Sequence, residues 1–171
     1  MNLETGLVEE FVSNTIYRLD ENTRMISISL ENLTDEDIWK RPNESSNSMG
    51  NLILHLCGNI TQYVISSLGE TEDTREREIE FNTRFGFTKA DLLEKLVHTV
   101  EKAKLTIKRT SKEQWLKKRM VQGFHFSGIG VALHAVEHYS YHTGQIAFWT
   151  KQLKNKDLEF YKGMDLNIKN E

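Results

Sequence analysis

Apolar residues recur every three to four positions in the first third of the chain, which is the spacing of one buried helix face. The first stripe predicts a helix over residues 4–32, and the polar residues from Thr34 start a short helical turn through Trp39. Ser48 can cap a second helix that runs to about Leu68. The stripe residues are Leu3, Leu7, Val8, Phe11, Val12, Ile16, Leu19, Ile26, Leu30 and Leu33 in the first helix, and Leu52, Leu56, Ile60, Tyr63 and Val64 in the second.

Two further stripes follow a polar connection. Residues 69–87 are polar and charged, and we expect them to cross the bundle as a connection of a length that is typically functional or mobile. Thr88 can cap a third helix over 89–109, and Ser127 opens the most apolar helix, over 127–153. Because four amphipathic helices bury their apolar faces most simply against one another, the sequence predicts an all-α four-helix bundle that forms a single domain over residues 1–171.

Composition excludes several classes of function. The chain has 38% hydrophobic and 27% charged residues and a net charge of −3, with no cluster of basic residues, so we expect no nucleic-acid partner. We expect no membrane partner, because no apolar run approaches the roughly 20 residues of a membrane span and no signal-peptide pattern is present. Cys57 is the single cysteine, which excludes an intrachain disulfide, fits a reducing compartment and favours a cytoplasmic location.

The last predicted helix contains three histidines that are candidates for a metal site. His134, His138 and His142 are spaced four residues apart, so they stack about one turn from each other on one side of the helix. At about 100° per residue, the apolar face centres on His142, with His138 roughly 40° and His134 roughly 80° away. His138 and His142 therefore face inward, and an i, i+4 pair of imidazoles can chelate one metal ion.

His55 is the natural third ligand. It lies on the buried stripe of the second helix, where an unpaired imidazole would be costly to desolvate. Together, His55, His138 and His142 would leave coordination positions open, as in a catalytic rather than a structural site. The alternative is that the histidine pair is incidental and that His55 is a hydrogen-bonded core residue. His134 is placed at the rim, with a role as an outer partner or a fourth ligand as alternatives.

The other candidate residues are expected to be structural. His98 lies on the charged side of the third helix and His125 in a loop, so both should be surface histidines. Cys57 is about 200° around the helix from His55 and should pack in the core.

The last helix contains a glycine and several small and aromatic residues. Gly144 costs about 1 kcal/mol relative to alanine in a helix interior, a cost that close approach of another helix would offset. We expect the neighbouring residues in the core, with a dimer interface as the alternative; they are Ala132, Ala135, Ala147, Phe148 and Trp149.

Three segments resemble one known family. Residues 47–56 (NSMGNLILHL) resemble a second helix with a single histidine, residues 138–146 (HYSYHTGQI) resemble an HxxxHxGQ segment, and residues 33–39 (LTDEDIW) resemble a turn after helix one. The family is the DinB/YfiT-like superfamily of metal-binding four-helix-bundle proteins. The resemblance implies His55, His138 and His142 as ligands of one divalent metal ion, often zinc or nickel. Thr143 departs from the pattern, since many relatives carry a basic residue or histidine there.

The resemblance also implies a function in thiol chemistry. Characterised members include transferases and isomerases that use bacillithiol, mycothiol or glutathione, so a metal-dependent S-transferase is expected, with a small-molecule thiol and an electrophile as partners. A homodimer is expected from the family and the apolar last helix. The same site could instead activate water in a metal-dependent hydrolase. In a third alternative, the protein is a non-catalytic metal-binding protein with a role in stress or interaction, and the ion is structural.

Overall fold

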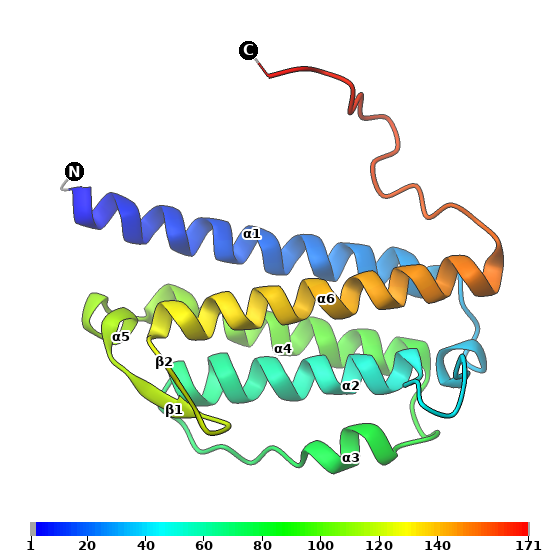
Figure 1. Ribbon diagram of the computed structural model, residues 1–171, viewed down its shortest axis with the longest axis horizontal. Helices are drawn as coiled ribbons and strands as arrows, with labels where there is room; N and C mark the ends of the chain where they lie inside the picture. Colours follow the sequence, from blue (N-terminus) through cyan, green and yellow to red (C-terminus); the bar gives the residue numbers. More distant parts are fainter. Residues whose placement is uncertain (1–2, 171) are drawn as a thin grey trace.

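Four long helices make up most of the computed structural model, which describes residues 3–170 (Figure 1). In chain order the elements are α1 (Leu3–Glu31), the 3₁₀ turn η1 (Asp37–Trp39), α2 (Met49–Ile60), the π-helix η2 (Thr61–Leu68), α3 (Arg77–Asn82), α4 (Lys89–Arg109), α5 (Lys112–Leu116), β1 (Arg119–Val121), β2 (Phe124–Phe126) and α6 (Gly128–Lys154). The predicted all-α bundle is confirmed. Within residues 3–170, no helix combines the length and apolar character needed to cross a membrane.

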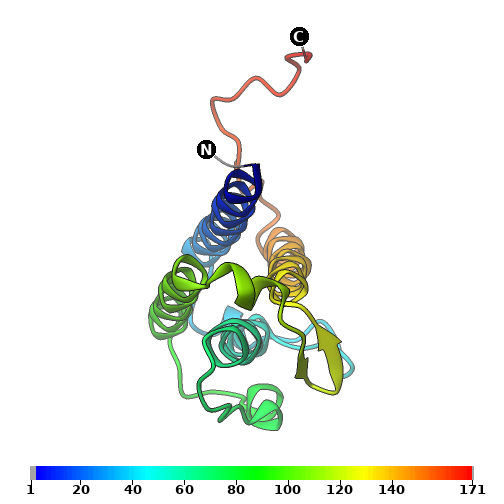
Figure 2. The same cartoon turned by 90° about the vertical axis from the view of Figure 1, so that its left-hand side faces the viewer.

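The helices α1, α2, α4 and α6 lie side by side, as the end-on view in Figure 2 shows. α1 packs against α4 and α6, and α2 packs against the same two helices. Each long helix thereby buries the apolar stripe that its sequence carries. The contact between α2 and α6 brings together the two helices that carry the candidate histidines.

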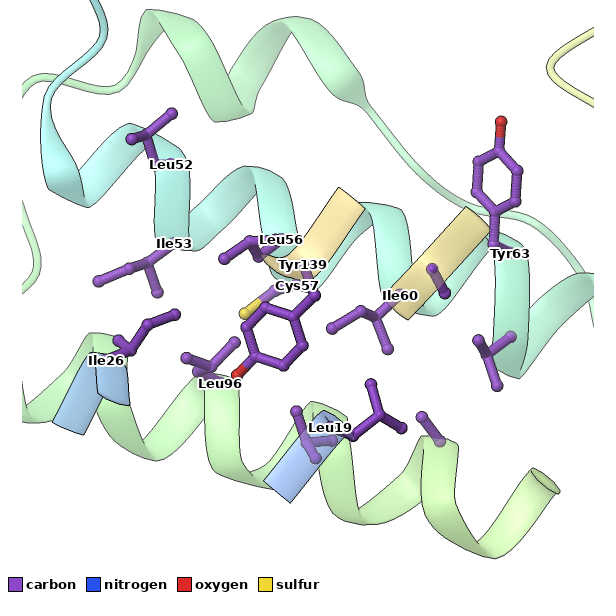
Figure 3. Close-up of a cluster of buried hydrophobic side chains, with 14 of the residues drawn as sticks. Leu19, Ile26, Leu52, Ile53, Leu56, Cys57, Ile60, Tyr63, Leu96 and Tyr139 are labelled. Carbon is purple, nitrogen blue, oxygen red and sulfur yellow. The ribbon is translucent and has the colours of Figure 1, made fainter. Parts of the chain in front are cut away.

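The centre of the bundle is filled by apolar side chains from all four long helices (Figure 3). Leu19 and Ile26 of α1 and Leu96 of α4 are fully buried there. Tyr139 of α6 is buried among them, and its hydroxyl forms a 2.8 Å hydrogen bond with the hydroxyl of Thr23. Complete burial of a large apolar side chain is worth about 1.5–3 kcal/mol, so this core fixes how α6 is turned relative to α2.

Side-chain caps start the helices where the sequence predicts them. Ser48 accepts a hydrogen bond from the backbone N–H of Asn51, whose side chain bonds back to Ser48, and Thr88 and Asp91 form the same reciprocal box before α4. Ser127 caps α6. These caps satisfy backbone donors that the first helical turn leaves free, and so they fix the first residue of each helix.

The second predicted helix reaches Leu68, but its last eight residues, Thr61–Leu68, have π-helical hydrogen bonding and form η2. A π-helical segment accommodates more residues per turn than an α-helix and is frequent near functional sites. It changes the direction of the side chains that follow Ile60, including Gln62 and Tyr63, which take part in the candidate site described below.

The two segments between the long helices contain more structure than the sequence indicates. The 69–87 connection contains α3, which lies along α2 (Figure 1). The segment before α6 contains α5 and the hairpin of β1 and β2, in which Met120 pairs with His125. Gln122 and Gly123 both have positive φ in its two-residue turn. His125 is therefore on a strand rather than in a loop, although it is exposed as expected.

Two expectations for α6 are wrong. Gly144 is exposed, and a Cβ added there would meet nothing within 4 Å, so no helix within residues 3–170 approaches it closely. Phe148 is 64% exposed and is not part of the core. Ala132 and Ala135 are buried as expected. The apolar character of α6 thus continues onto its outer side.

Candidate metal centre

The structure brings the three predicted ligands together between α2 and α6. His55 projects from α2, and His138 and His142 project from successive turns of α6. Their ligand nitrogens all lie within 4.8 Å of one another, and His55 Nε2 is 2.8 Å from His138 Nε2. His55 and His142 are buried and His138 is half-buried. The cluster is therefore partly open to solvent at His138, unlike the fully buried apolar core.

Glu80 and Arg75 hold His55 from the opposite side of its ring. Glu80 Oε2 lies 2.8 Å from His55 Nδ1, and Arg75 donates to the same carboxylate from Nε at 2.7 Å and from Nη2 at 2.9 Å. Arg75 Nη2 also lies 3.1 Å from His55 Nδ1. Of the two groups beside Nδ1, only the Glu80 carboxylate can accept a proton, because a guanidinium has no acceptor atom. Nδ1–H therefore donates to Glu80, and the lone pair of Nε2 points towards the other two histidines.

Glu80 is ionised at neutral pH. Burial acts to raise its pKa, but the hydrogen bonds from Arg75 and His55 outweigh burial and hold the pKa below the ordinary value of a glutamate. The carboxylate fits against α2 because residue 58 is a glycine: a Cβ on Gly58 would clash with Glu80 Oε1. Arg75 is held in turn by Gln62, which accepts a 2.8 Å hydrogen bond from Arg75 Nη1.

Gln145 orients the third histidine. His142 Nδ1 lies 2.7 Å from Gln145 Oε1, three residues further along α6. An amide oxygen can only accept, so Nδ1 carries the proton and Nε2 of His142 keeps its lone pair. Hydrogen bonds of this kind fix the tautomer and the ring orientation of metal-binding histidines. Two of the three candidate ligands therefore have their outward nitrogens held by acceptors.

His138 and His142 are neutral at physiological pH. Burial, followed by the neighbouring His142 and His55, lowers the pKa of His138 to about 3. Burial also lowers the pKa of His142, against the hydrogen bond with Gln145, which acts to raise it. A neutral imidazole is the form that binds a metal, so protons do not compete for these nitrogens at pH 7.

The cluster fits one divalent metal ion. Three neutral imidazoles are a typical donor set for zinc and related ions. The nitrogens lie within 4.8 Å of one another, and each needs to be about 2.0–2.1 Å from the ion, so small side-chain movements suffice to surround it. Because three protein ligands are fewer than such an ion takes, His55, His138 and His142 could hold it and leave room for an exchangeable ligand.

His134 stands outside this group, one turn before His138. Its ring stacks on Tyr63 with centroids 4.0 Å apart and lies nearly parallel to His138 at 5.5 Å. Asn59 Nδ2 lies 3.5 Å from its Nε2, and burial lowers its pKa. His134 is half-buried, in agreement with the rim position expected from the helical facing.

The residues expected to be structural stay away from the cluster. His98 is exposed on α4. Cys57 is buried, and burial raises the pKa of its thiol to about 11, so the thiol stays protonated at neutral pH. Thr143 is buried and donates a hydrogen bond to the Tyr139 carbonyl. Its side chain therefore takes part in the packing of α6.

Sequence reasoning missed the residues that support the ligands. Arg75 and Glu80 lie in the 69–87 connection, where no periodic pattern marks them. Only the unusual length of that connection indicated a functional segment. Gln145 was visible as part of the HxxxHxGQ segment, and its position three residues after His142 places it on the same side of the helix.

A family comparison gives one match that spans most of the chain. The sequence model of the family described as "Protein of unknown function (DUF1572)" matches residues 6–162. No curated protein matches the chain.

Solved structures with the same architecture include proteins from three bacteria. A DinB-like protein (YjoA) from Bacillus subtilis has a TM-score of 0.66 and 18% identity, over 89% of this chain and 96% of that one. A DinB-like protein from Bacillus cereus has a TM-score of 0.68 and 14% identity, over 85% and 91%. A conserved protein from Enterococcus faecalis has a TM-score of 0.64 and 16% identity, over 91% and 99%. These likenesses show the fold, which is DinB-like, and so confirm the resemblance seen in the sequence.

Proposed function

We propose a function from two premises: the chain belongs to the family described as "Protein of unknown function (DUF1572)", and it has the DinB-like fold. The proposed function is that of a metal-dependent S-transferase that activates a low-molecular-weight thiol. The observation that carries the proposal is the cluster of His55, His138 and His142, which has the donors for one ion and room for a further ligand. A bound divalent ion deprotonates a coordinated thiol and so supplies a thiolate at neutral pH.

The chain's own residues have two tasks in this proposal. His55, His138 and His142 bind the ion, and Glu80 and Gln145 orient two of the three rings through their Nδ1 atoms. The thiol must come from a separate molecule. Cys57 is the single cysteine of the chain, and its side chain is buried with a raised pKa, so it cannot serve as the nucleophile.

The proposed ion is zinc or nickel. Elemental analysis of protein purified without chelators should find close to one equivalent of one of them. The variant His55→Ala should lose most of the metal, whereas His98→Ala, which removes an exposed histidine from α4, should keep it. Wild-type protein with far less than one equivalent of every transition metal would contradict the proposal.

Thiol transfer can be followed with monochlorobimane. The thiol sulfur forms a bond to the chloromethyl carbon, the carbon–chlorine bond breaks, chloride leaves with the bonding pair, and the thiol proton goes to solvent. Metal-loaded protein should accelerate this conjugation with glutathione, bacillithiol, mycothiol or cysteine, and chelation or His142→Ala should abolish the acceleration. Absence of turnover by metal-loaded protein with all four thiols overturns the proposal.

The same preparation separates the two alternative functions. A metal-dependent hydrolase would cleave substrates from an ester and amide panel without added thiol. A non-catalytic metal-binding protein would show neither activity, and His142→Ala would lower only its melting temperature.

Two further parts of the proposal concern assembly and location. We propose a homodimer, because α6 is an apolar helix and its Leu133, which lies outside the cavity described below, remains 56% exposed. Light scattering should then give twice the 19.9 kDa chain mass, and a monomer would contradict it. A cytoplasmic location is part of the same proposal, since low-molecular-weight thiols are kept reduced there.

A further inference from the structure

A cavity of about 640 Å³ lies directly beside the histidine cluster. Its walls come from the segment between η1 and α2, from the first turn of α2, and from the C-terminal half of α6. Its lining includes the buried side chains of Met49 and Leu52, the exposed rings of Tyr141 and Phe148, and the half-buried ring of Trp149. The volume falls in the range of sites for small molecules, about 300–1,000 Å³.

The cavity shares one residue, His142, with the candidate metal centre. His142 lines it, and so does Gln145, whose side-chain oxygen lies 2.7 Å from His142 Nδ1. A molecule in this cavity therefore lies against one of the three candidate ligands. The cavity is on the side of the cluster away from the Arg75–Glu80 ion pair, which contacts His55 instead.

The walls of this cavity carry no charge. All the residues that line it lie within the described part of the chain, and none of them is an aspartate, glutamate, lysine or arginine. By contrast, the smaller cavity on the other side of α2, about 300 Å³, is lined by Arg75, Glu76, Glu80 and Lys95. An ionic group placed in the uncharged cavity would lose water without gaining an opposite charge, whereas a flat apolar group would gain ring contacts.

We propose that the uncharged cavity is the binding site for the electrophilic substrate, and that this substrate is a neutral molecule with an aromatic or similarly flat apolar group. This assignment rests on the proposed thiol-transfer function. The lining residues offer no countercharge to a carboxylate, so we assign the cavity to the neutral electrophile and not to the anionic part of a thiol. The amides of Gln145 and Gln152 supply neutral hydrogen-bonding groups at its edge.

A matched pair of probes tests this without any turnover. 2-Naphthalenemethanol and 2-naphthoate share one ring system and differ in charge, and their binding is measured by calorimetry at pH 7 on the protein as purified and after chelation. In the chelated protein, where no ion can bind a carboxylate, the neutral probe should bind at least about tenfold more tightly than the carboxylate. Equal or tighter binding of 2-naphthoate by the chelated protein overturns the proposal.

Exposed cavity residues allow variants that keep the fold. Phe148→Ala removes a ring that is 64% exposed and should weaken binding of the neutral probe about tenfold, whereas Phe124→Ala, which removes a 61% exposed ring from β2, should leave it unchanged. Gln152→Lys should tighten binding of 2-naphthoate severalfold and leave 2-naphthalenemethanol unaffected, because it supplies the missing countercharge.

The outcomes separate this proposal from the one on which it rests. Loss of selectivity or of the Phe148→Ala effect, with thiol transfer intact, overturns the cavity assignment alone. Selective binding without thiol transfer supports the cavity and overturns the transferase function. If Phe148→Ala changes the mass measured by light scattering and not the affinity for the neutral probe, this face is an interface between copies, and the cavity assignment fails.

Discussion

At the scale of single residues, Glu80 determines the tautomer and the ring orientation of His55. Its carboxylate accepts the Nδ1 proton at 2.8 Å and is itself fixed by two hydrogen bonds from Arg75. We expect Glu80→Gln to reduce metal affinity about 10–100-fold, because an amide can also donate to Nδ1 and no longer enforces one tautomer. Competition with a chromophoric chelator measures this change.

The matched control is Glu78→Gln on the same short helix. Glu78 is exposed, so this variant removes one negative charge near the site without touching His55. Its metal affinity should equal that of the wild type. If both variants bind metal equally well, Glu80 has no role in orienting the ligand.

Gly144 offers a test at a second residue. It is exposed in the interior of α6, and an added Cβ would meet nothing within 4 Å. Gly144→Ala should therefore stabilise the protein by about 0.5–1 kcal/mol, since alanine loses less backbone entropy in a helix. Urea unfolding measures the gain, and metal content should not change. Destabilisation by Gly144→Ala would indicate that another chain approaches α6 at this point.

At the scale of elements, Asp37 connects η1 to the end of α6. The carboxylate is buried and pairs with Lys154 of α6 and with Lys40, and it accepts the backbone N–H of Thr34. The hydrogen bonds from Lys154 and then from Lys40 hold the pKa of Asp37 far below its ordinary range. Because the folded state has the lower pKa, Asp37 stabilises the protein above its ordinary pKa of about 4, and this stabilisation is lost as the pH falls further.

The expected result is a pH-dependent loss of stability in one variant. Asp37→Asn should cost about 1–2 kcal/mol of unfolding free energy at pH 7, and the difference from the wild type should shrink towards pH 3. Urea unfolding at both pH values measures it. Glu36→Gln, which changes an exposed neighbour, should show no such difference at pH 7. A difference that is the same at pH 7 and pH 3 would argue against the ion pairs.

Elements with regular periodicity and caps were predictable, and the connections between them were not. α4 begins after Thr88 as predicted because its capping box is formed within four consecutive residues. The short helix α3 has no such local signal, and its position depends on the burial of Glu80 against Gly58 of α2. Local hydrogen bonding decides the first case and long-range packing the second.

At the scale of the whole molecule, a bound metal should stabilise the fold, because α2 and α6 come together at the site only in the native state. With free metal at about 100 times its Kd, the gain is about 2.7 kcal/mol, which corresponds to roughly 5–10 °C in Tm for a chain of this size. Chelation should therefore lower Tm by that amount, and added metal should restore it.

The control for this prediction is a variant without one ligand. His142→Ala should have a Tm that does not respond to chelation or to added metal. Thermal scans followed by circular dichroism measure both proteins. An equal response of the wild type and the variant would show that the ion acts elsewhere in the molecule.

The sequence by itself determined the four long helices, their starting residues and the inward direction of His138 and His142, because these depend on periodicity and on contacts within a few residues. It also indicated His55 as the third ligand. Only the tertiary structure decided that Glu80 and Arg75 support His55, that an uncharged cavity adjoins His142, and that Phe148 lies outside the core. These features join residues far apart in the chain, and their geometry follows from how α2, α3 and α6 pack rather than from any local pattern.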